Sequence, residues 1–152
     1  MLYLVQHGEA TSKETNPERP LTERGEVDMG HLGAFLARAG ISVGRIWESG
    51  KLRARQSAEI LGEHLTPGQP PEETEGLGAT DPVGPITNRL REGEGLMVVS
   101  HLPLVGNIAG DLVAGSEDHP PVAFQPGTAV ALVHNDEQGW QVAWMNRPEL
   151  LR

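Results

Sequence analysis

Two short apolar runs, each leading into a histidine, restrict the fold of this chain more than any other feature. Leu2–Val5 is uninterrupted and gives way to His7, and Leu96–Ser100 is followed directly by His101. An apolar run of this length is typical of a strand buried on both faces of a sheet. Parallel strands bring their carboxyl ends to one edge, where open α/β proteins bind ligands, so we expect the two histidines to share a pocket.

Strand and helix patterns alternate along the rest of the chain, which predicts a three-layer α/β/α sandwich with a mostly parallel sheet. Thr22 is a typical N-cap for the first helix, and the turn 135–139 is typical of a hairpin that adds an antiparallel edge. We expect helices over Glu23–Ala39, Leu52–Leu65, Ile86–Arg91 and Leu104–Ala114, further strands over Arg45–Glu48, Thr128–His134 and Trp140–Trp144, and irregular structure over Glu72–Pro85. The apolar face of the first helix would use Val27, Leu32, Phe35, Leu36 and Ala39.

Length and charge narrow the class of protein. The 152 residues are expected to form one domain, 1–152. A net charge of −9 disfavours a nucleic-acid or anionic-membrane binder, which needs a basic face. No cysteine is present, and the six histidines show no metal-ligand spacing, so neither a thiolate nucleophile nor a metal or other cofactor is expected. Without a signal peptide or an apolar span of about 20 residues, a cytoplasmic location is expected.

Several motifs together resemble the histidine phosphatase superfamily, the phosphoglycerate mutase-like proteins. The motifs are His7-Gly8, Arg19-Pro20-Leu21-Thr22, Leu52-Arg53-Ala54-Arg55-Gln56-Ser57 and Ser100-His101-Leu102-Pro103-Leu104-Val105-Gly106. Within that superfamily the chain is most similar to the small bacterial SixA-type phosphohistidine phosphatases. The hallmark of the superfamily is Arg-His-Gly at the end of the first strand, and here Gln6 stands where that arginine is expected.

The resemblance implies a hydrolase whose two histidines do different work. His7 would be the nucleophile and would carry a phosphohistidine intermediate. For that, one ring nitrogen must be unprotonated while the other donates to a fixed acceptor, which by position is the carbonyl of Gly8 or a close neighbour. His101, in a protonated form, would hold a phosphate oxygen and stabilise the transition state.

The same resemblance implies a set of phosphate ligands. Arg53 lies in the first turn of a helix, where the helix N-terminus already favours an anion and a guanidinium can grip two oxygens. Arg19 matches the family's second phosphate arginine, and Pro20 after it favours extended backbone. Gln6 and Gly8 complete the expected set of phosphate ligands. Gln6 can donate hydrogen bonds but lacks the positive charge of the hallmark arginine, and Lys51 could supply that charge instead.

The general acid and the substrate stay open on sequence alone. Glu9 and Asp81 are the possible acids, although residues in such positions are more often structural or solvated than catalytic. A short chain without long insertions suits a phosphate presented on a protein, so the partner is expected to be a phosphohistidine domain or, alternatively, a small phosphoester. A phosphate-binding module with little turnover is the second alternative, and Gln6 motivates it.

Overall fold

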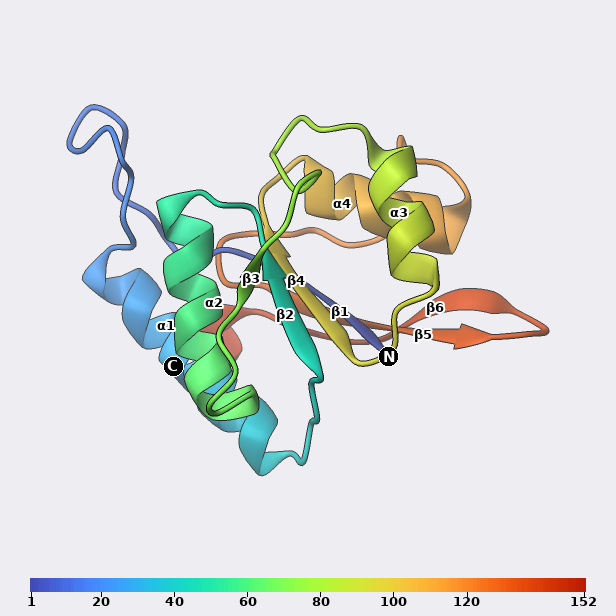
Figure 1. The fold of residues 1–152 in the computed structure, drawn as a ribbon, viewed down its shortest axis with the longest axis horizontal. Helices are drawn as coiled ribbons and strands as arrows, with labels where there is room; N and C mark the ends of the chain where they lie inside the picture. The colour runs from blue at the N-terminus through green and yellow to red at the C-terminus, as the bar shows by residue number, and fades with distance from the viewer.

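A six-stranded sheet forms the middle layer of the computed structural model, which describes residues 1–152 (Figure 1). The strands lie in the order β3-β2-β4-β1-β5-β6. Strands β1 to β4 pair in parallel, and β5 and β6 add antiparallel pairs at one edge. The strands are β1 (Leu2–Gln6), β2 (Arg45–Glu48), β3 (Glu72–Glu73), β4 (Leu96–Ser100), β5 (Ala129–Asn135) and β6 (Gly139–Asn146).

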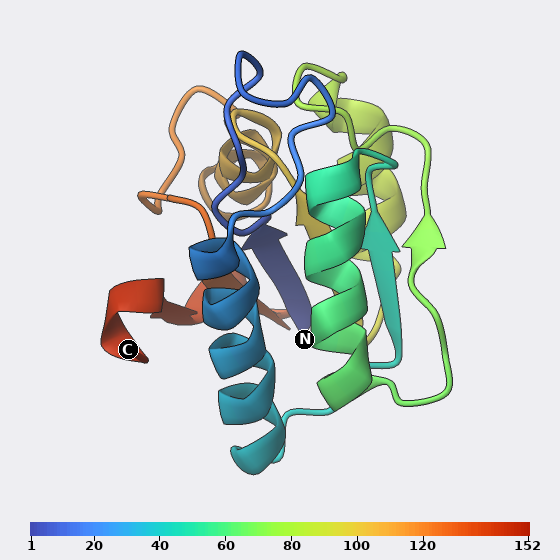
Figure 2. The same cartoon turned by 90° about the vertical axis from the view of Figure 1, so that its left-hand side faces the viewer.

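Helices cover both faces of this sheet, as Figures 1 and 2 show. Helices α1 (Glu23–Arg38) and α2 (Leu52–Leu65) pack on one face. Helices α3 (Val83–Arg91) and α4 (Leu104–Ala109) pack on the other, and a π-helical turn, η1 (Gly110–Ala114), continues α4. A short 3₁₀ turn, η2 (Pro148–Leu150), follows β6. The predicted three-layer sandwich with a C-terminal antiparallel hairpin is therefore confirmed.

The composition of β1 explains why both faces are covered. Side chains alternate along a strand, so Tyr3 and Val5 enter the core under α1 and α2, whereas Leu2 and Leu4 enter the core under α3 and α4. All five residues of β1 are buried, and so are all five of β4. Gln6 shares the face of Leu2 and Leu4, so a polar side chain ends the buried strand.

The expected apolar face of α1 is wrong in part. Val27, Phe35 and Ala39 are exposed, whereas Met29 is buried together with Leu32 and Leu36. The reason is the contact between α1 and α2 at Gly33, where a Cβ atom would lie 2.6 Å from the ring of His64. This close approach fixes the rotation of α1 and turns Val27 and Phe35 outward.

Other element boundaries differ little from the predictions. Helix α3 begins at Val83, three residues earlier than expected, and two residues of the segment expected to be irregular form β3. Thr22 caps α1 as predicted, because its side chain accepts the Gly25 N–H at 3.0 Å. None of the helices is both long enough and apolar enough to cross a membrane.

Candidate active site

The two strand-terminal histidines meet at the carboxyl edge of the sheet. Because β1 and β4 are parallel neighbours with Gln6 opposite Ser100, His7 and His101 leave the sheet side by side. The two ring centroids are 5.0 Å apart and the ring planes are tilted by 57°. Both residues are buried, with 7% of His7 and 2% of His101 exposed. The prediction that the two histidines come together at one edge of the sheet is confirmed.

Hydrogen bonds fix which nitrogen of His7 carries the proton. Nδ1 lies 2.7 Å from the carbonyl oxygen of Gly8, which can only accept, so Nδ1 is the donor. Nε2 lies 3.3 Å from Nε–H of Arg53, which can only donate, so Nε2 presents a lone pair. The expectation that Gly8 supplies the acceptor is confirmed, and the ring is the tautomer that a nucleophile needs.

Burial keeps this imidazole neutral. The pKa of His7 is lowered to about 4; desolvation is the largest cause, and the charges of Arg53 and Arg19 act in the same direction. The hydrogen bond to Gly8 acts in the opposite direction but is the weaker influence. At neutral pH the Nε2 lone pair is therefore free of a proton.

His101 has a different hydrogen-bonding environment. Its Nε2 lies 2.6 Å from the hydroxyl of Ser49, and its Nδ1 is buried without a partner. The pKa of His101 is lowered to about 3. Burial is the largest cause, followed by electrostatic interactions with His7, Arg53 and Lys51. In the free protein burial and the nearby cations favour the neutral ring, so the protonated form of His101 stays a prediction for the phosphate-bound protein.

Those cations leave positive charge beside the two histidines without a carboxylate partner. Arg53 and Arg19 both act on the two histidines, and neither forms an ion pair with a carboxylate. Burial and the charge of Arg19 lower the pKa of Arg53, which shows that the guanidinium groups are poorly compensated. An entering dianion would relieve this repulsion and take charge-assisted hydrogen bonds from Arg53. Lys51 is exposed on the same side.

The loop that carries Arg19 is a tight reversal, and the expectation of extended backbone there is wrong. Arg19 has a φ of 51°, in the left-handed region. The chain must turn at Asn16, whose carbonyl accepts the Arg19 N–H, and then pair Pro20 with Thr11. The side chain is held as well, because Nε of Arg19 donates to the carbonyl of Thr11 at 3.1 Å.

Gln6 and Gly8 are the remaining expected phosphate ligands, and their polar groups differ in whether they already have hydrogen-bond partners. Gln6 is buried, and its Oε1 has no hydrogen-bond partner. The N–H of Gly8 already donates to the hydroxyl of Ser57 at 2.9 Å. Gly8 must be glycine for packing, because a Cβ atom there would lie 2.9 Å from Met29 and 3.0 Å from the carbonyl of Gly25.

The two candidate acids are engaged elsewhere. The Glu9 carboxylate accepts from the hydroxyl of Thr22 at 2.7 Å, and Asp81 accepts from the N–H of Gly78 at 2.7 Å. Neither forms a hydrogen bond with His7 or His101. No group of three His, Asp or Glu side chains lies close enough together to hold a metal ion.

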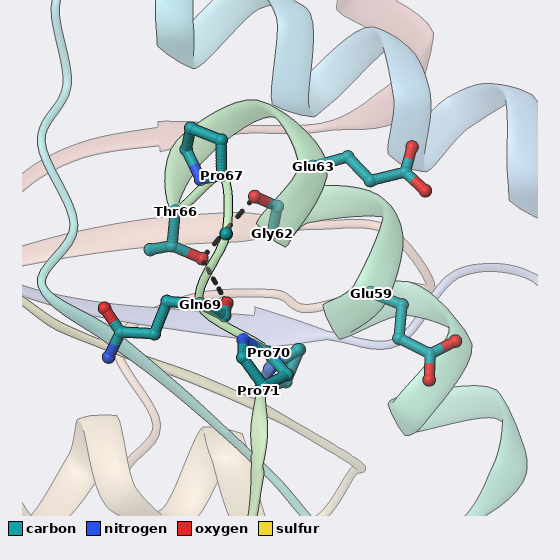
Figure 3. Close-up of a pocket in the computed structure, with 9 residues that line it drawn as sticks. Glu59, Gly62, Glu63, Thr66, Pro67, Gln69, Pro70 and Pro71 are labelled. Carbon is teal, nitrogen blue, oxygen red and sulfur yellow. Dashed lines mark hydrogen bonds between the residues drawn. The ribbon is translucent and has the colours of Figure 1, made fainter.

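Sequence reasoning missed Ser49 and Ser57, which hold the site from β2 and α2. Ser49 bonds His101 and also lines a hollow of about 570 Å³ whose wall includes Glu73, Glu75 and Asp81. Ser49 follows a strand end, which is a weak signal; Ser57 ends the motif that carries Arg53, but nothing in a single sequence shows that it contacts Gly8. Another hollow, of about 430 Å³, lies at the other end of α2 around Thr66 and the prolines after it (Figure 3).

Comparisons with known proteins agree with this geometry. The model of the histidine phosphatase superfamily (branch 1) matches residues 2–82. The chain is 30% identical to phosphohistidine phosphatase SixA of Escherichia coli, over 95% of this chain and 94% of that protein. A solved structure of the protein histidine phosphatase SixA complexed with tungstate superposes with a TM-score of 0.86, at 24% identity and 99% coverage of both chains. The alpha-ribazole phosphatase of Shigella flexneri shares the fold, with a TM-score of 0.72 at 16% identity and 97% and 96% coverage.

Proposed function

This chain belongs to the histidine phosphatase superfamily and is a hydrolytic phosphatase, and from that premise we propose that it removes phosphate from protein phosphohistidine through an intermediate on His7. The observation that carries the proposal is the unprotonated Nε2 of His7, which lies beside two uncompensated guanidinium groups. A phosphoryl group needs a nucleophile in line with the leaving group and cations around its equatorial oxygens.

The proposed reaction has two displacements at phosphorus. Arg53 and Arg19 bind the phosphoryl oxygens, while Gln6 and Gly8 border the same end of β1. Nε2 of His7 attacks phosphorus, the bond from phosphorus to the substrate nitrogen breaks, and the substrate imidazole leaves in neutral form. Water then attacks the phosphohistidine, the bond to Nε2 breaks, and inorganic phosphate leaves with His7 restored. His101 stabilises the charge on the phosphoryl group in both steps.

The surroundings of the two carboxylates favour a phosphoramidate over an ester. An alkoxide leaving group needs a general acid, and Glu9 and Asp81 are both held by other groups. An imidazole whose second nitrogen carries a proton leaves as a neutral molecule and needs less help. The name of the Escherichia coli relative supports the same class of substrate.

Two other functions have specific support. A small-molecule phosphomonoesterase is supported by the shared fold with an alpha-ribazole phosphatase. A phosphate-binding module with little turnover is supported by Gln6, which supplies no charge at the position of the hallmark arginine. The partner is thus a phosphorylated protein or a small phosphoester, and neither a nucleic acid nor a membrane is proposed. The cytoplasmic location stays a prediction from sequence.

One assay separates the three functions. Purified protein is supplied with a protein phosphorylated on histidine and, separately, with an aryl phosphate, and phosphate release is measured beside His7→Ala. The proposal expects turnover of the phosphohistidine protein with a higher kcat/KM, and none in His7→Ala. Preference for the aryl phosphate would favour the phosphomonoesterase. Phosphate binding without turnover of either substrate would favour the binding module.

A further inference from the structure

A single buried hydroxyl links the loop of His7 to the helix that carries Arg53. Ser57 lies in the second turn of α2 and has no exposed surface. Its Oγ accepts the Gly8 N–H at 2.9 Å and donates to the carbonyl of Arg53 at 2.8 Å. The hydroxyl therefore makes one hydrogen bond toward each half of the site.

Gly8 needs an external restraint of this kind. The close packing of Met29 and Gly25 leaves no room for a side chain at this position, and glycine has the most flexible backbone of all residues. The carbonyl of Gly8 is the acceptor that holds the proton on Nδ1 of His7. The direction of that carbonyl depends on the two dihedral angles of Gly8, and Ser57 fixes the peptide plane from which these angles begin.

We propose that Ser57 is a positioning residue for His7: by anchoring Gly8 to α2, it keeps the imidazole in the Nδ1–H tautomer and its Nε2 lone pair beside Arg53. Ser57 does not touch the substrate. The kinetic part of this inference rests on the proposed function, whereas the tautomer of His7 can be measured whether or not the protein turns over a substrate.

A purely structural serine is the competing explanation, and the chain offers a matched control for it. Thr87 in α3 is also buried, with 1% exposed, and its hydroxyl also donates to a carbonyl one turn earlier, that of Gly84 at 3.1 Å. It lies under the opposite face of the sheet and makes no hydrogen bond to the histidine loops. Thr87→Val removes a buried hydroxyl without affecting Gly8.

The experiment compares Ser57→Ala, Ser57→Thr and Thr87→Val with the wild type. Nitrogen-15 NMR of the His7 ring reports which nitrogen carries the proton, and steady-state kinetics report kcat and KM on the phosphohistidine protein. We expect Ser57→Ala to populate the Nε2–H tautomer and to lower kcat about tenfold with KM within about twofold. Ser57→Thr, which keeps a hydroxyl, should restore both, and Thr87→Val should change neither.

The outcomes are separable. A wild-type tautomer in Ser57→Ala, with kcat no lower than in Thr87→Val, overturns the proposal. If the wild type has no turnover, the proposed function fails, and the ring tautomer alone decides the role of Ser57. If Ser57→Thr does not fold because its extra methyl group has no room, the comparison of Ser57→Ala with the control Thr87→Val still tests the proposal.

Discussion

Nε of Arg53 donates a hydrogen bond to Nε2 of His7 across 3.3 Å, so the guanidinium covers the lone pair that would attack phosphorus. In the proposed reaction an entering phosphoryl group breaks this hydrogen bond. Its oxygens replace Nε2 as the acceptor for Arg53, and its phosphorus then faces the freed lone pair of His7. Binding of the anion and exposure of the nucleophile are thereby a single event.

Substitution of Arg53 should weaken anion binding strongly. Charge-assisted hydrogen bonds contribute about 1.5–3 kcal/mol net, so Arg53→Gln should weaken the binding of inorganic phosphate about ten- to a few-hundredfold. Arg53→Lys should recover only part, because an ammonium keeps the charge but loses the two-pronged geometry. Titration calorimetry measures the affinities, with the exposed Arg38→Gln at the far end of α1 as control. Equal affinity in Arg53→Gln and Arg38→Gln would remove Arg53 from the site.

The two histidines should differ when each is replaced. His7→Ala should abolish turnover, because no atom is left to form the bond to phosphorus. His101→Ala should slow turnover yet still permit phosphorylation of His7, since His101 stabilises charge. Rapid quenching should trap a phosphoenzyme that is labile in acid and stable in alkali, as a phosphoramidate is. Full activity of His7→Ala would show that the chemistry is assigned to the wrong residue.

Gln6→Arg tests whether charge limits the reaction. If it does, turnover should rise about ten- to a few-hundredfold through one more charge-assisted contact in the transition state. The buried arginine would add a third cation beside Arg53 and Arg19, so the free protein should lose stability and regain it when phosphate is added. Thermal unfolding of the variant with and without phosphate measures both the loss of stability and its recovery. Unchanged turnover in the variant would mean that Lys51 or another group already supplies the charge.

Sequence predicts the layers and the convergence of the histidines because both depend on strong local patterns. Short contiguous apolar runs are typical of central strands, and parallel central strands bring their carboxyl ends to one edge. What sequence could not supply is contact between segments that no pattern links. The rotation of α1 depends on Gly33 meeting His64, and the role of Ser57 depends on α2 lying beside Gly8. The neutral form of free His101 depends on burial and on cations from two different segments, one holding Arg19 and the other Lys51 and Arg53.

The pKa values predict a loss of stability in mild acid. In the folded state the pKa of His7 is about 4 and that of His101 about 3, both below the ordinary 6.5, so protonation favours the unfolded chain. The free energy of unfolding should fall as pH decreases from about 6.5 to about 4, by up to about 1.4 kcal/mol per pH unit for each histidine. Denaturant unfolding at several pH values measures the slope.

Variants separate this effect from that of the carboxylates, which also titrate in acid. His101→Asn should reduce the slope between pH 6.5 and 4, whereas Thr87→Val, which removes a buried hydroxyl but no titratable group, should leave it unchanged. A slope in His101→Asn equal to that of the wild type would contradict the neutral, buried form of His101.

Two glycines of α1 should respond to alanine in opposite directions. At Gly25 a Cβ atom would lie 2.2 Å from the carbonyl oxygen of Glu9, so Gly25→Ala should displace the segment after His7 and cost about 1–3 kcal/mol of stability or more. At Gly30 nothing lies within 4 Å, so Gly30→Ala should stabilise the helix by about 0.5–1 kcal/mol. Chemical denaturation of both variants measures the difference. A Gly25→Ala variant more stable than the wild type would mean that α1 is not in close contact with the backbone of Glu9.

The strand order also determines when this site can come into existence as the chain is made. The neighbours of β1 are β4 and β5, and both come from residues after position 95. A nascent chain that ends before Leu96 already contains His7, Arg19 and Arg53, yet it lacks both strands that hold β1 in the sheet. Such a chain must wait for its second half, because contacts between distant segments form only after long loops close. A truncated chain of that length would therefore keep most of the family's motifs without having an active site.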